Sequence, residues 1–289
     1  MYTIETIDEL RQYIKNVRQS GKTIGYVATM GYLHEGHLSL VQAARAQSDI
    51  VVVSIFVNPL QFGPNEDYED YPRDLKKDQQ LLENSGCDVL FAPSVSEMYP
   101  REMATFVELP ELSNKLCGRT RPIHFRGVAT VVCKLLNIVQ PDAAYFGQKD
   151  GQQVAVIRRM VDDLNLPVRI VSVPIVREAD GLAKSSRNIY LTEAERPHAT
   201  VLYRALRAAA DEIVAGDRSV EAIIQRMADT ISAEPGVRLD YAEMVDTATL
   251  QRPDTIEGDL MLAVAAFIGR ARLIDNIPMQ VEGNRVRLL

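Results

Sequence analysis

The sequence has 289 residues, a net charge of −7 at pH 7 and hydrophobic residues at 46% of its positions. A chain of this length and composition buries enough apolar surface to fold as a globular protein without disulfides or structural metals. Its longest apolar run, residues 260–269, is about half of the roughly 20 residues that a membrane helix needs, so no membrane partner is expected. The acidic balance argues against broad nucleic-acid binding but is compatible with a small anionic ligand.

The N-terminus and the cysteines suggest a cytoplasmic location. The first residues, MYTIETIDELRQ, lack the basic segment followed by an apolar stretch that marks a secretion signal. Cys87, Cys117 and Cys133 lie far apart and form no C-x-x-C pair, so we expect neither a disulfide framework nor a zinc ribbon. The expectation is a reducing compartment.

Strand-like and helical patterns alternate along the first 173 residues. Runs rich in β-branched residues are expected strands, and segments with apolar residues at helical spacing are expected helices. In chain order these are strand 23–29, helix 37–47, strand 50–57, helix 74–84, strand 88–92, helix 126–139, strand 142–147, helix 151–164 and strand 168–173. Such alternation predicts an α/β fold with a Rossmann-like, doubly wound parallel sheet.

The pattern changes after about residue 180. Two long amphipathic helices are followed by three strand-like runs, at 193–214 and 219–232 and then at 237–246, 259–268 and 271–277. This order predicts a smaller α+β domain. We therefore predict an N-terminal domain over residues 1–178 and a C-terminal α+β lid domain over residues 179–289.

The segment Met-Gly-Tyr-Leu-His-Glu-Gly-His, residues 30–37, separates the first expected strand from the first expected helix. Ligands of a parallel sheet bind beyond the carboxyl ends of its strands, near helix N-termini. Glycines there allow a phosphate to approach the backbone closely. His34 and His37, three residues apart, can share one helical face and donate hydrogen bonds to a triphosphate. A zinc-binding pair and two ordinary surface histidines are the alternatives.

Two further segments follow expected strands. In Asn58-Pro59-Leu60-Gln61 the amides of Asn58 and Gln61 suit a hydroxylated acid, although Asn-Pro can simply start a turn. After the strand at 142–147, Lys149 offers a point charge to a phosphate and Asp150 can cap a helix or bind ribose hydroxyls. Gln153 lies one turn further along and can point toward the same crevice. Here the alternative is a helix cap beside a solvated lysine.

The loop Gly181-Leu-Ala-Lys-Ser-Ser-Arg-Asn188 combines two hydroxyls and a guanidinium after a glycine, as an anion-binding cradle does. A polar linker between domains is the alternative. Residues 121–127, RPIHFRG, form a weaker, basic candidate site. The alternative is that this segment simply starts the helix that follows. Asp78 is a candidate magnesium ligand.

Together these segments resemble the family of pantothenate synthetases, also called pantoate–β-alanine ligases. The resemblance rests on TMGYLHEGH at 29–37, FVNPLQFG at 56–63, PDAAYFGQKD at 141–150 and GLAKSSRN at 181–188, with YPRD at 71–74 and HFRGVATVV at 124–132 adding to it. H-x-G-H alone indicates only the wider nucleotidyltransferase superfamily. Another such nucleotidyltransferase, acting on a small metabolite, is therefore the alternative.

The resemblance implies an ATP-dependent, magnesium-requiring homodimer that joins pantoate to β-alanine through pantoyl adenylate, releasing AMP and pyrophosphate. It implies catalytic roles for His34, His37, Lys149 and Arg187. The residues implied to contact pantoate are Asn58, Gln61 and Gln153, and Gln61 is also implied to lie near β-alanine. The implied ATP contacts are Met30, Gly31, Tyr32, Leu33, His34, Glu35, Gly36, His37, Gly147, Gln148, Lys149, Asp150, Val176, Lys184, Ser185, Ser186 and Arg187.

Three positions depart from the family pattern. Lys184 stands where an apolar residue is frequent, Gly151 where an aromatic residue is common, and Ile123 where glycine is frequent. Lys184 adds a cation, and Gly151 is expected to weaken the first turn of its helix by about 1 kcal/mol. None of the three removes a group that the chemistry needs.

Overall fold

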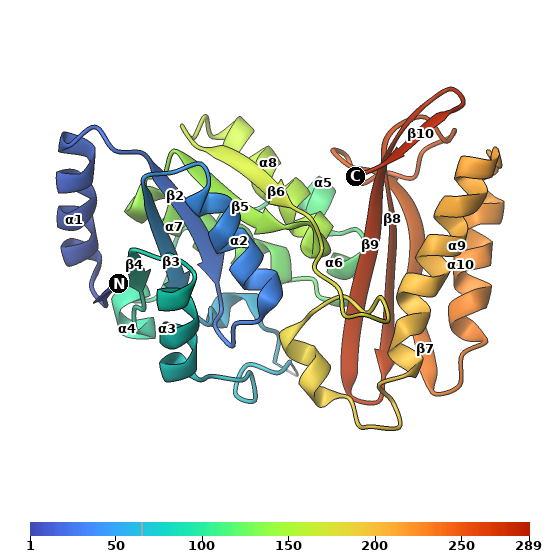
Figure 1. Cartoon of the computed structure of the whole chain (residues 1–289), viewed down its shortest axis with the longest axis horizontal. Helices are drawn as coiled ribbons and strands as arrows, with labels where there is room; N and C mark the ends of the chain where they lie inside the picture. Colours follow the sequence, from blue (N-terminus) through green and yellow to red (C-terminus); the bar gives the residue numbers. More distant parts are fainter. Residues whose placement is uncertain (65) are drawn as a thin grey trace. The chain divides into compact units, whose positions relative to one another are not determined.

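The computed structural model describes residues 1–64 and 66–289. The chain divides into two compact units, whose elements are labelled in Figure 1. The first unit comprises residues 1–114, 118–147 and 156–173, and the second comprises residues 115–117, 148–155 and 174–289. The main break thus follows Val173, and a domain boundary after residue 178 stays a prediction.

The first unit contains a six-stranded sheet in the order β1-β4-β3-β2-β5-β6, in which every pairing is parallel. The strands are β1 (Tyr2–Ile4), β2 (Ile24–Thr29), β3 (Ile50–Ile55), β4 (Val89–Phe91), β5 (Ala143–Gly147) and β6 (Arg169–Val173). Residues 50–54 of β3 are all buried, as expected for a strand covered on both faces. The predicted parallel α/β fold is confirmed.

The α-helices within residues 1–173 are α1 (Ile7–Gln19), α2 (Glu35–Arg45), α3 (Leu75–Asn84), α4 (Val95–Met98), α5 (Pro110–Ser113), α6 (Cys117–Thr120), α7 (His124–Val139) and α8 (Gly151–Asp163). On one face of the sheet, Val41 of α2 and Leu82 of α3 share a core with Val27 and Val53. Successive strand residues point to opposite faces, so Tyr26 lies on the other side. There α7 packs against β2 and α1 (Figure 1).

The second unit is built on an antiparallel sheet in the order β10-β9-β8-β7. Its strands are β7 (Val237–Asp246), β8 (Gly258–Ile268), β9 (Ala271–Glu282) and β10 (Arg285–Leu288), and its helices are α9 (Val201–Ala215) and α10 (Val220–Ser232). Helix α9 packs on β8 and β9, and α10 packs on β7 and α9. The predicted smaller α+β part is therefore confirmed.

Some elements differ from the sequence-based expectations. The structure contains β1, α1 and β10, which were not predicted, and β9 continues beyond residue 277 to Glu282. The helix expected over 193–214 begins only at Val201. Residues 193–197 form turns that end at Pro197, whose ring and missing N–H do not fit a helix interior.

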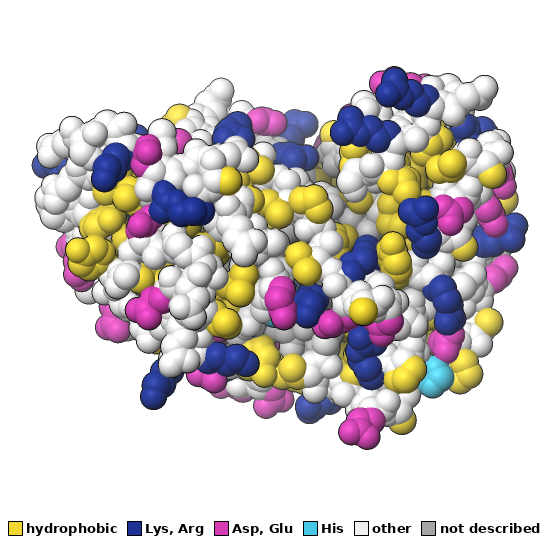
Figure 2. Space-filling model, viewed as in Figure 1, with side chains coloured by type: hydrophobic (Ala, Val, Ile, Leu, Met, Phe, Trp, Pro, Cys, Tyr) yellow, Lys and Arg dark blue, Asp and Glu magenta, His cyan; other side chains and the backbone are white. Residues whose placement is uncertain are grey.

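The surface shown in Figure 2 mixes positive and negative side chains, with hydrophobic side chains in small groups between them. On this face, side chains of both charges are therefore interspersed over the described residues. Among the described residues, no helix has both the length and the apolar character needed to cross a bilayer.

Candidate active site

The H-x-G-H turn connects the end of β2 to the start of α2. His34 is the N-cap of α2, and its Nδ1 accepts a hydrogen bond from the Gly36 N–H at 3.1 Å. The His34 N–H in turn donates to Nδ1 of His37 at 3.3 Å, and the two ring centroids lie 4.1 Å apart. The rings thus lie side by side, as the three-residue spacing predicts. Because Nδ1 is the acceptor in both rings, the neutral form of each carries its proton on Nε2.

Gly36 is needed for this arrangement. A Cβ atom at Gly36 would lie 2.9 Å from both Cε1 and Nδ1 of His34. Any side chain would therefore displace the imidazole from its capping position. The glycine of H-x-G-H thus has a packing role within the protein itself.

Asp78 of α3 holds the turn that precedes the histidines. Its side chain is 1% exposed, with Oδ2 lying 2.8 Å from the Tyr32 nitrogen and Oδ1 lying 2.7 Å from the Leu33 nitrogen. Gly31 and Tyr32 both have positive φ angles, of 84° and 51°. Two backbone donors of an unusual turn therefore meet one carboxylate. Burial raises the pKa of Asp78, and the two backbone donors oppose that rise.

In this structure Asp78 supports the turn, a role that the sequence did not suggest. Both carboxylate oxygens already accept backbone hydrogen bonds within the protein. No group of three or more His, Cys, Asp or Glu side chains in the described ranges, 1–64 and 66–289, is arranged to hold a metal ion. A magnesium-binding role for Asp78 stays a prediction.

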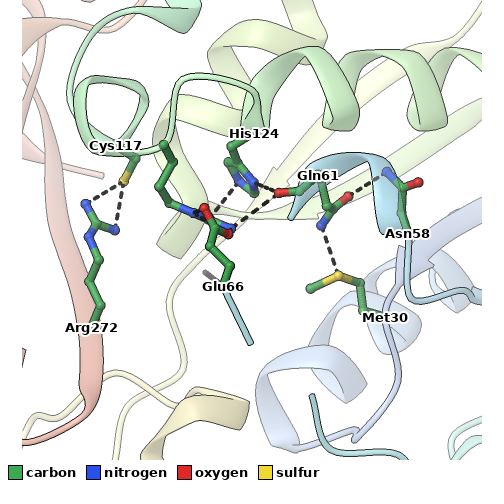
Figure 3. Close-up of polar contacts among 8 residues, drawn as sticks. Met30, Asn58, Gln61, Glu66, Cys117, His124 and Arg272 are labelled. Atoms are coloured by element: carbon green, nitrogen blue, oxygen red, sulfur yellow. Dashed lines mark hydrogen bonds and ion pairs between the residues drawn. The ribbon is translucent and has the colours of Figure 1, made fainter. Parts of the chain in front are cut away.

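The turn after β3, which is the 3₁₀ helix η1 (Pro59–Gln61), places Gln61 beside Met30 (Figure 3). The Gln61 Nε2 lies 2.9 Å from the Met30 Sδ, and the Asn58 Nδ2 donates to the Gln61 Oε1 at 3.1 Å. Residues that follow two neighbouring parallel strands are thereby brought together. This is the arrangement that the sheet edge predicts.

Asn58 is a supporting residue in this structure. It is 1% exposed, and its Nδ2 also donates to the Gly127 carbonyl at 3.1 Å. Its Oδ1 accepts from the Tyr99 hydroxyl at 2.7 Å and from the Leu60 N–H at 3.3 Å. The amide is therefore surrounded by protein partners and orients Gln61. A direct contact of Asn58 with pantoate stays a prediction.

Residues 121–127, a weak candidate in the sequence, support Gln61 from the other side (Figure 3). The His124 Nε2 lies 3.2 Å from the Arg121 Nη1, and its Nδ1 lies 3.0 Å from the Gln61 carbonyl oxygen. A guanidinium only donates, so Nε2 accepts and Nδ1 carries the proton that bonds the carbonyl. Arg121 also pairs with Glu66, with its Nε 3.0 Å from both carboxylate oxygens.

Gly127 ends the weakly predicted segment 121–127, but the sequence assigned it no role of its own. A Cβ atom there would lie 2.3 Å from the Leu60 carbonyl oxygen and 2.5 Å from the Gln61 Cα. These are backbone atoms that cannot move aside easily, so α7 approaches the Gln61 turn only because residue 127 is glycine. A glycine inside an otherwise apolar helical pattern was the available signal.

In the second unit, Gln148, Lys149 and Asp150 form the 3₁₀ helix η2 before α8. The Lys149 Nζ lies 3.9 Å from the Asp150 Oδ1. The side chain of Asn276 on β9 donates to the carbonyl oxygens of both Gln148 and Lys149 at 2.9 Å. Gln153 is half-buried in the first turn of α8. The lysine is thus anchored through its backbone.

Gly147 ends β5 in the first unit. A Cβ atom there would meet no described atom within 4 Å, and its φ does not lie in the left-handed region. Neither packing nor backbone conformation therefore requires glycine at this position. The predicted contact with a nucleotide is compatible with that open space.

Residues 176–184 form a tight hairpin in the second unit. The Lys184 N–H donates to the Val176 carbonyl at 2.9 Å, and Arg177 and Ala183 form a β-bridge. The Lys184 Nζ lies 3.3 Å from the Glu178 Oε2, so the extra cation of this sequence is paired inside the hairpin.

The hairpin leads into the 3₁₀ helix η3 (Ser186–Tyr190). Ser185 is its N-cap, and its hydroxyl accepts from the Arg187 N–H at 3.3 Å. Ser186 is buried and Arg187 is half-buried. The cap therefore fixes the backbone from which the Arg187 side chain extends.

Gln152, next to the predicted Gln153, has a structural role. Its Oε1 accepts from the Cys117 N–H at 3.0 Å, and its Nε2 donates to the Lys115 carbonyl at 2.7 Å. The thiol of Cys117 lies 3.5 Å from the Arg272 Nη1 (Figure 3). The amide therefore attaches residues 115–117 to the second unit.

The remaining departures from the family pattern have local explanations. A Cβ atom at Gly151 would lie 2.5 Å from the Met261 Sδ, so the glycine makes room for that buried side chain. Ile123 precedes α7 and is 42% exposed, so its side chain lies at the surface.

The first unit has a parallel sheet whose strands β2 and β3 end in a histidine-bearing helix start and an amide-bearing turn. This is the arrangement of an α/β enzyme that binds its ligand beyond the carboxyl edge of the sheet. The chain belongs to the pantoate–β-alanine ligase family, whose model matches residues 2–278. Its activity is the joining of pantoate to β-alanine by an amide bond.

Individual relatives match over nearly the whole chain. The pantothenate synthetase of Heliobacterium modesticaldum is 57% identical over 281 residues, covering 97% of this chain and 100% of that protein. The crystal structure of pantothenate synthetase from Thermus thermophilus is 48% identical, with a TM-score of 0.91, and covers 96% of this chain and 98% of that one. The ligase from Francisella tularensis, solved with an ATP compound and β-alanine, is 36% identical, with a TM-score of 0.77, and covers 96% and 97%.

Proposed function

We propose that this ligase uses ATP to activate pantoate as pantoyl adenylate before β-alanine attacks. A carboxylate is unreactive toward an amine near neutral pH, so it needs a leaving group. The Francisella tularensis ligase was solved with an ATP compound and β-alanine, which supports this substrate pair. The histidine-bearing N-terminus of α2, at the end of a parallel strand, is the observation that carries the proposal.

In the first step, a carboxylate oxygen of pantoate attacks the α-phosphorus of ATP. The bond between the α-phosphorus and its bridging oxygen breaks, and pyrophosphate leaves. The Nε2–H groups of His34 and His37, together with Lys149 and Arg187, stabilise the charge on the departing pyrophosphate, and His37 can donate a proton to it. Loss of one such contact typically lowers the rate by about 10²–10³-fold.

In the second step, the amine of β-alanine attacks the acyl carbon of the adenylate. The bond from that carbon to the AMP oxygen breaks, AMP leaves, and the new amide nitrogen loses a proton. Gln61 and Gln153 hold pantoate, with Asn58 orienting Gln61 and with Gln61 also close to β-alanine. The fixed side chain of Gln61 suits this work because it is oriented by Asn58 and Met30.

The nucleotide contacts follow the predicted segments. The backbone of residues 30–37 offers N–H groups at a helix start, where anions bind well. The remaining ATP contacts are assigned to Gly147, Gln148, Lys149, Asp150, Val176, Lys184, Ser185, Ser186 and Arg187. Lys184 acts from a position where Glu178 offsets part of its charge.

Magnesium enters this proposal with the nucleotide. Mg²⁺ commonly binds to substrate phosphates through only one or two protein carboxylates. The described residues offer no preformed cluster of three or more metal-ligating side chains, which fits a cation carried on ATP. When bound, it neutralises phosphate charge.

We also propose that the enzyme is a cytoplasmic homodimer, as the family resemblance implies. Cys87, Cys117 and Cys133 form no disulfide, which is compatible with a reducing compartment. Light scattering on the purified chain should give twice its mass of 32.2 kDa. A mass equal to one chain at micromolar concentration would rule out the dimer.

The decisive experiment is isotope exchange between ATP and pyrophosphate. The exchange should require pantoate and should proceed without β-alanine, because the adenylate forms before the amine reacts. Adding β-alanine should then yield AMP and pantothenate. Replacement of His37 by alanine should lower the exchange by about 10²-fold or more. Exchange that ignores pantoate would exclude the adenylate route, and unchanged exchange in H37A would exclude the role given to His37.

A further inference from the structure

Two adjacent residues of β9, Asp275 and Asn276, are each 3% exposed although both are polar. Buried polar side chains need partners, and a buried charge needs a counter-ion. Within the second unit these two residues find their partners in two separate segments, both of which the proposed function assigns to ATP. Neither residue belongs to the motifs that were identified in the sequence.

Asn276 fixes the segment that carries Lys149. Its Nδ2 donates to the Gln148 and Lys149 carbonyl oxygens, each at 2.9 Å. Its Oδ1 accepts from the Gln148 Nε2 at 3.3 Å. An amide group has only two protons to donate, so both are used on consecutive carbonyls. The direction of the amide is therefore defined by three contacts, and the backbone under Lys149 is held in one orientation.

Asp275 fixes the hairpin that leads to Ser185. Its Oδ2 and Oδ1 lie 2.6 and 2.9 Å from Nη1 and Nη2 of Arg177, and its Oδ1 also accepts from the Asn276 N–H at 2.8 Å. Such a two-point contact sets the plane of the guanidinium. The same Nη1 donates to the Gly181 carbonyl at 3.0 Å, on the opposite side of the hairpin.

Packing reinforces that contact. The Arg177 Cζ lies 4.0 Å from the centre of the Tyr203 ring. Gly181 has a φ of +94°, and a Cβ atom there would lie 2.3 Å from the Tyr203 ring. The hairpin therefore rests on α9 at one side and on β9 at the other. Its outgoing strand runs through Ala183 to Ser185, where the loop with Arg187 begins.

We propose that Asp275 and Asn276 are positioning residues that hold two ATP-binding segments, residues 148–149 and 176–187, on one rigid strand. This inference rests on the proposed function, because the assignment of those segments to ATP comes from it. The pair itself does not touch ATP. It acts through Lys149 on one side and through Arg177 and the loop ending in Arg187 on the other.

The test replaces Asn276 by aspartate, which keeps the shape and removes both donors. We expect the dissociation constant for an unreactive ATP analogue, measured by calorimetry without pantoate, to rise by about tenfold or more. The KM for pantoate in the exchange assay should change less than about twofold. Arg177→Lys keeps the charge but loses the two-point contact, so it should weaken ATP binding in the same direction. Gln280→Glu, also an amide-to-carboxylate change on β9, is the matched control and should leave ATP binding unchanged.

If Asn276→Asp lowers the melting temperature too far for binding studies, Asn276→Ser keeps one donor and a neutral side chain. It should bind the analogue less tightly than the parent but remain folded. Folded variants at position 276 and at Arg177 that bind the analogue as tightly as the parent would overturn the inference. So would equal losses for ATP and for pantoate, which indicate general loosening. Absence of exchange in the parent enzyme would instead count against the adenylate route, while calorimetry would still decide the role of the β9 pair.

Discussion

The carboxylate of Asp78 lies 2.8 Å from the backbone nitrogen of Tyr32, a non-glycine residue with a φ of 51°. This contact, together with the one to Leu33, stabilises a turn that the backbone by itself disfavours. The turn sets the position of His34 and of the start of α2. A buried acid on another helix thereby controls the geometry of the histidine pair.

Asp78→Asn tests that relationship. An amide offers only one acceptor, so one backbone N–H would face an NH₂ group. We expect a loss of about 1–3 kcal/mol in the free energy of unfolding. The exchange rate should fall about tenfold or more, because small misplacements of catalytic groups are costly. Denaturant titration in metal-free buffer measures the first effect, with Asp162→Asn on the exposed end of α8 as the control. A variant of full stability whose only defect is a higher magnesium requirement would point to metal binding instead.

Gly147→Ala separates a ligand contact from a folding requirement. No protein atom in the described part of the chain would touch the new methyl group, so the melting temperature should stay the same or rise slightly. If ATP approaches this strand end as proposed, the KM for ATP should rise by about tenfold.

Gly25→Ala gives the comparison for that experiment. Its Cβ atom would lie 2.6 Å from the Ser48 hydroxyl, so this variant should lose stability. An unchanged KM for ATP in Gly147→Ala would remove Gly147 from the nucleotide site.

Two buried tyrosines of the central sheet should respond oppositely to loss of the hydroxyl. The Tyr26 hydroxyl lies 2.6 Å from the Ser54 hydroxyl, whereas the Tyr145 hydroxyl is buried without a hydrogen-bond partner among the described residues. Tyr26→Phe should cost about 1 kcal/mol of unfolding free energy, and Tyr145→Phe should be neutral or stabilising by up to about 1 kcal/mol. Thermal and denaturant unfolding of the two variants side by side measure the difference. Equal losses in both would show that Tyr145 has a partner in solution.

Glu234 should make stability depend on pH in the acid range. Its carboxylate lies 2.6 Å from the His198 Nδ1 and 2.5 Å from the Arg204 Nη2, and these hydrogen bonds lower its pKa below the ordinary value of 4.5. A lowered pKa stabilises the fold above the unfolded-state value, and this stabilisation is lost as the pH falls through the folded-state value.

The corresponding variant is Glu234→Gln. It should be less stable than the parent by up to about 1 kcal/mol at pH 6, and the gap should close below pH 4. Melting curves across that range, with Glu5→Gln removing an equal charge at an exposed site, give the measurement. A gap that stays constant down to pH 3 would contradict the ion-pair explanation.

The sequence by itself determined the alternation of strands and helices and the place of the H-x-G-H turn. These features depend on local physics, since the period of the apolar residues defines each element and glycines and caps define its ends. Parallel topology also predicts that residues following neighbouring strands meet at one edge of the sheet. Met30 and Gln61 are in contact there. The prediction missed α1, although the signals of this helix are local. Thr6 and Glu9 form a T-x-x-E capping pattern, and the apolar residues that follow them recur at helical spacing.

Only the tertiary structure decided which residues support the site. Asp78 bonds a turn 46 residues away, Asn58 bonds a carbonyl 69 residues away, and Asn276 bonds a carbonyl 128 residues away. Such contacts follow no local period, because they depend on which faces of separate elements meet in the core. For the same reason the sequence assigned no role to Gly127 by itself, whereas the fold requires it so that the backbone of the Gln61 turn can pass directly beside it.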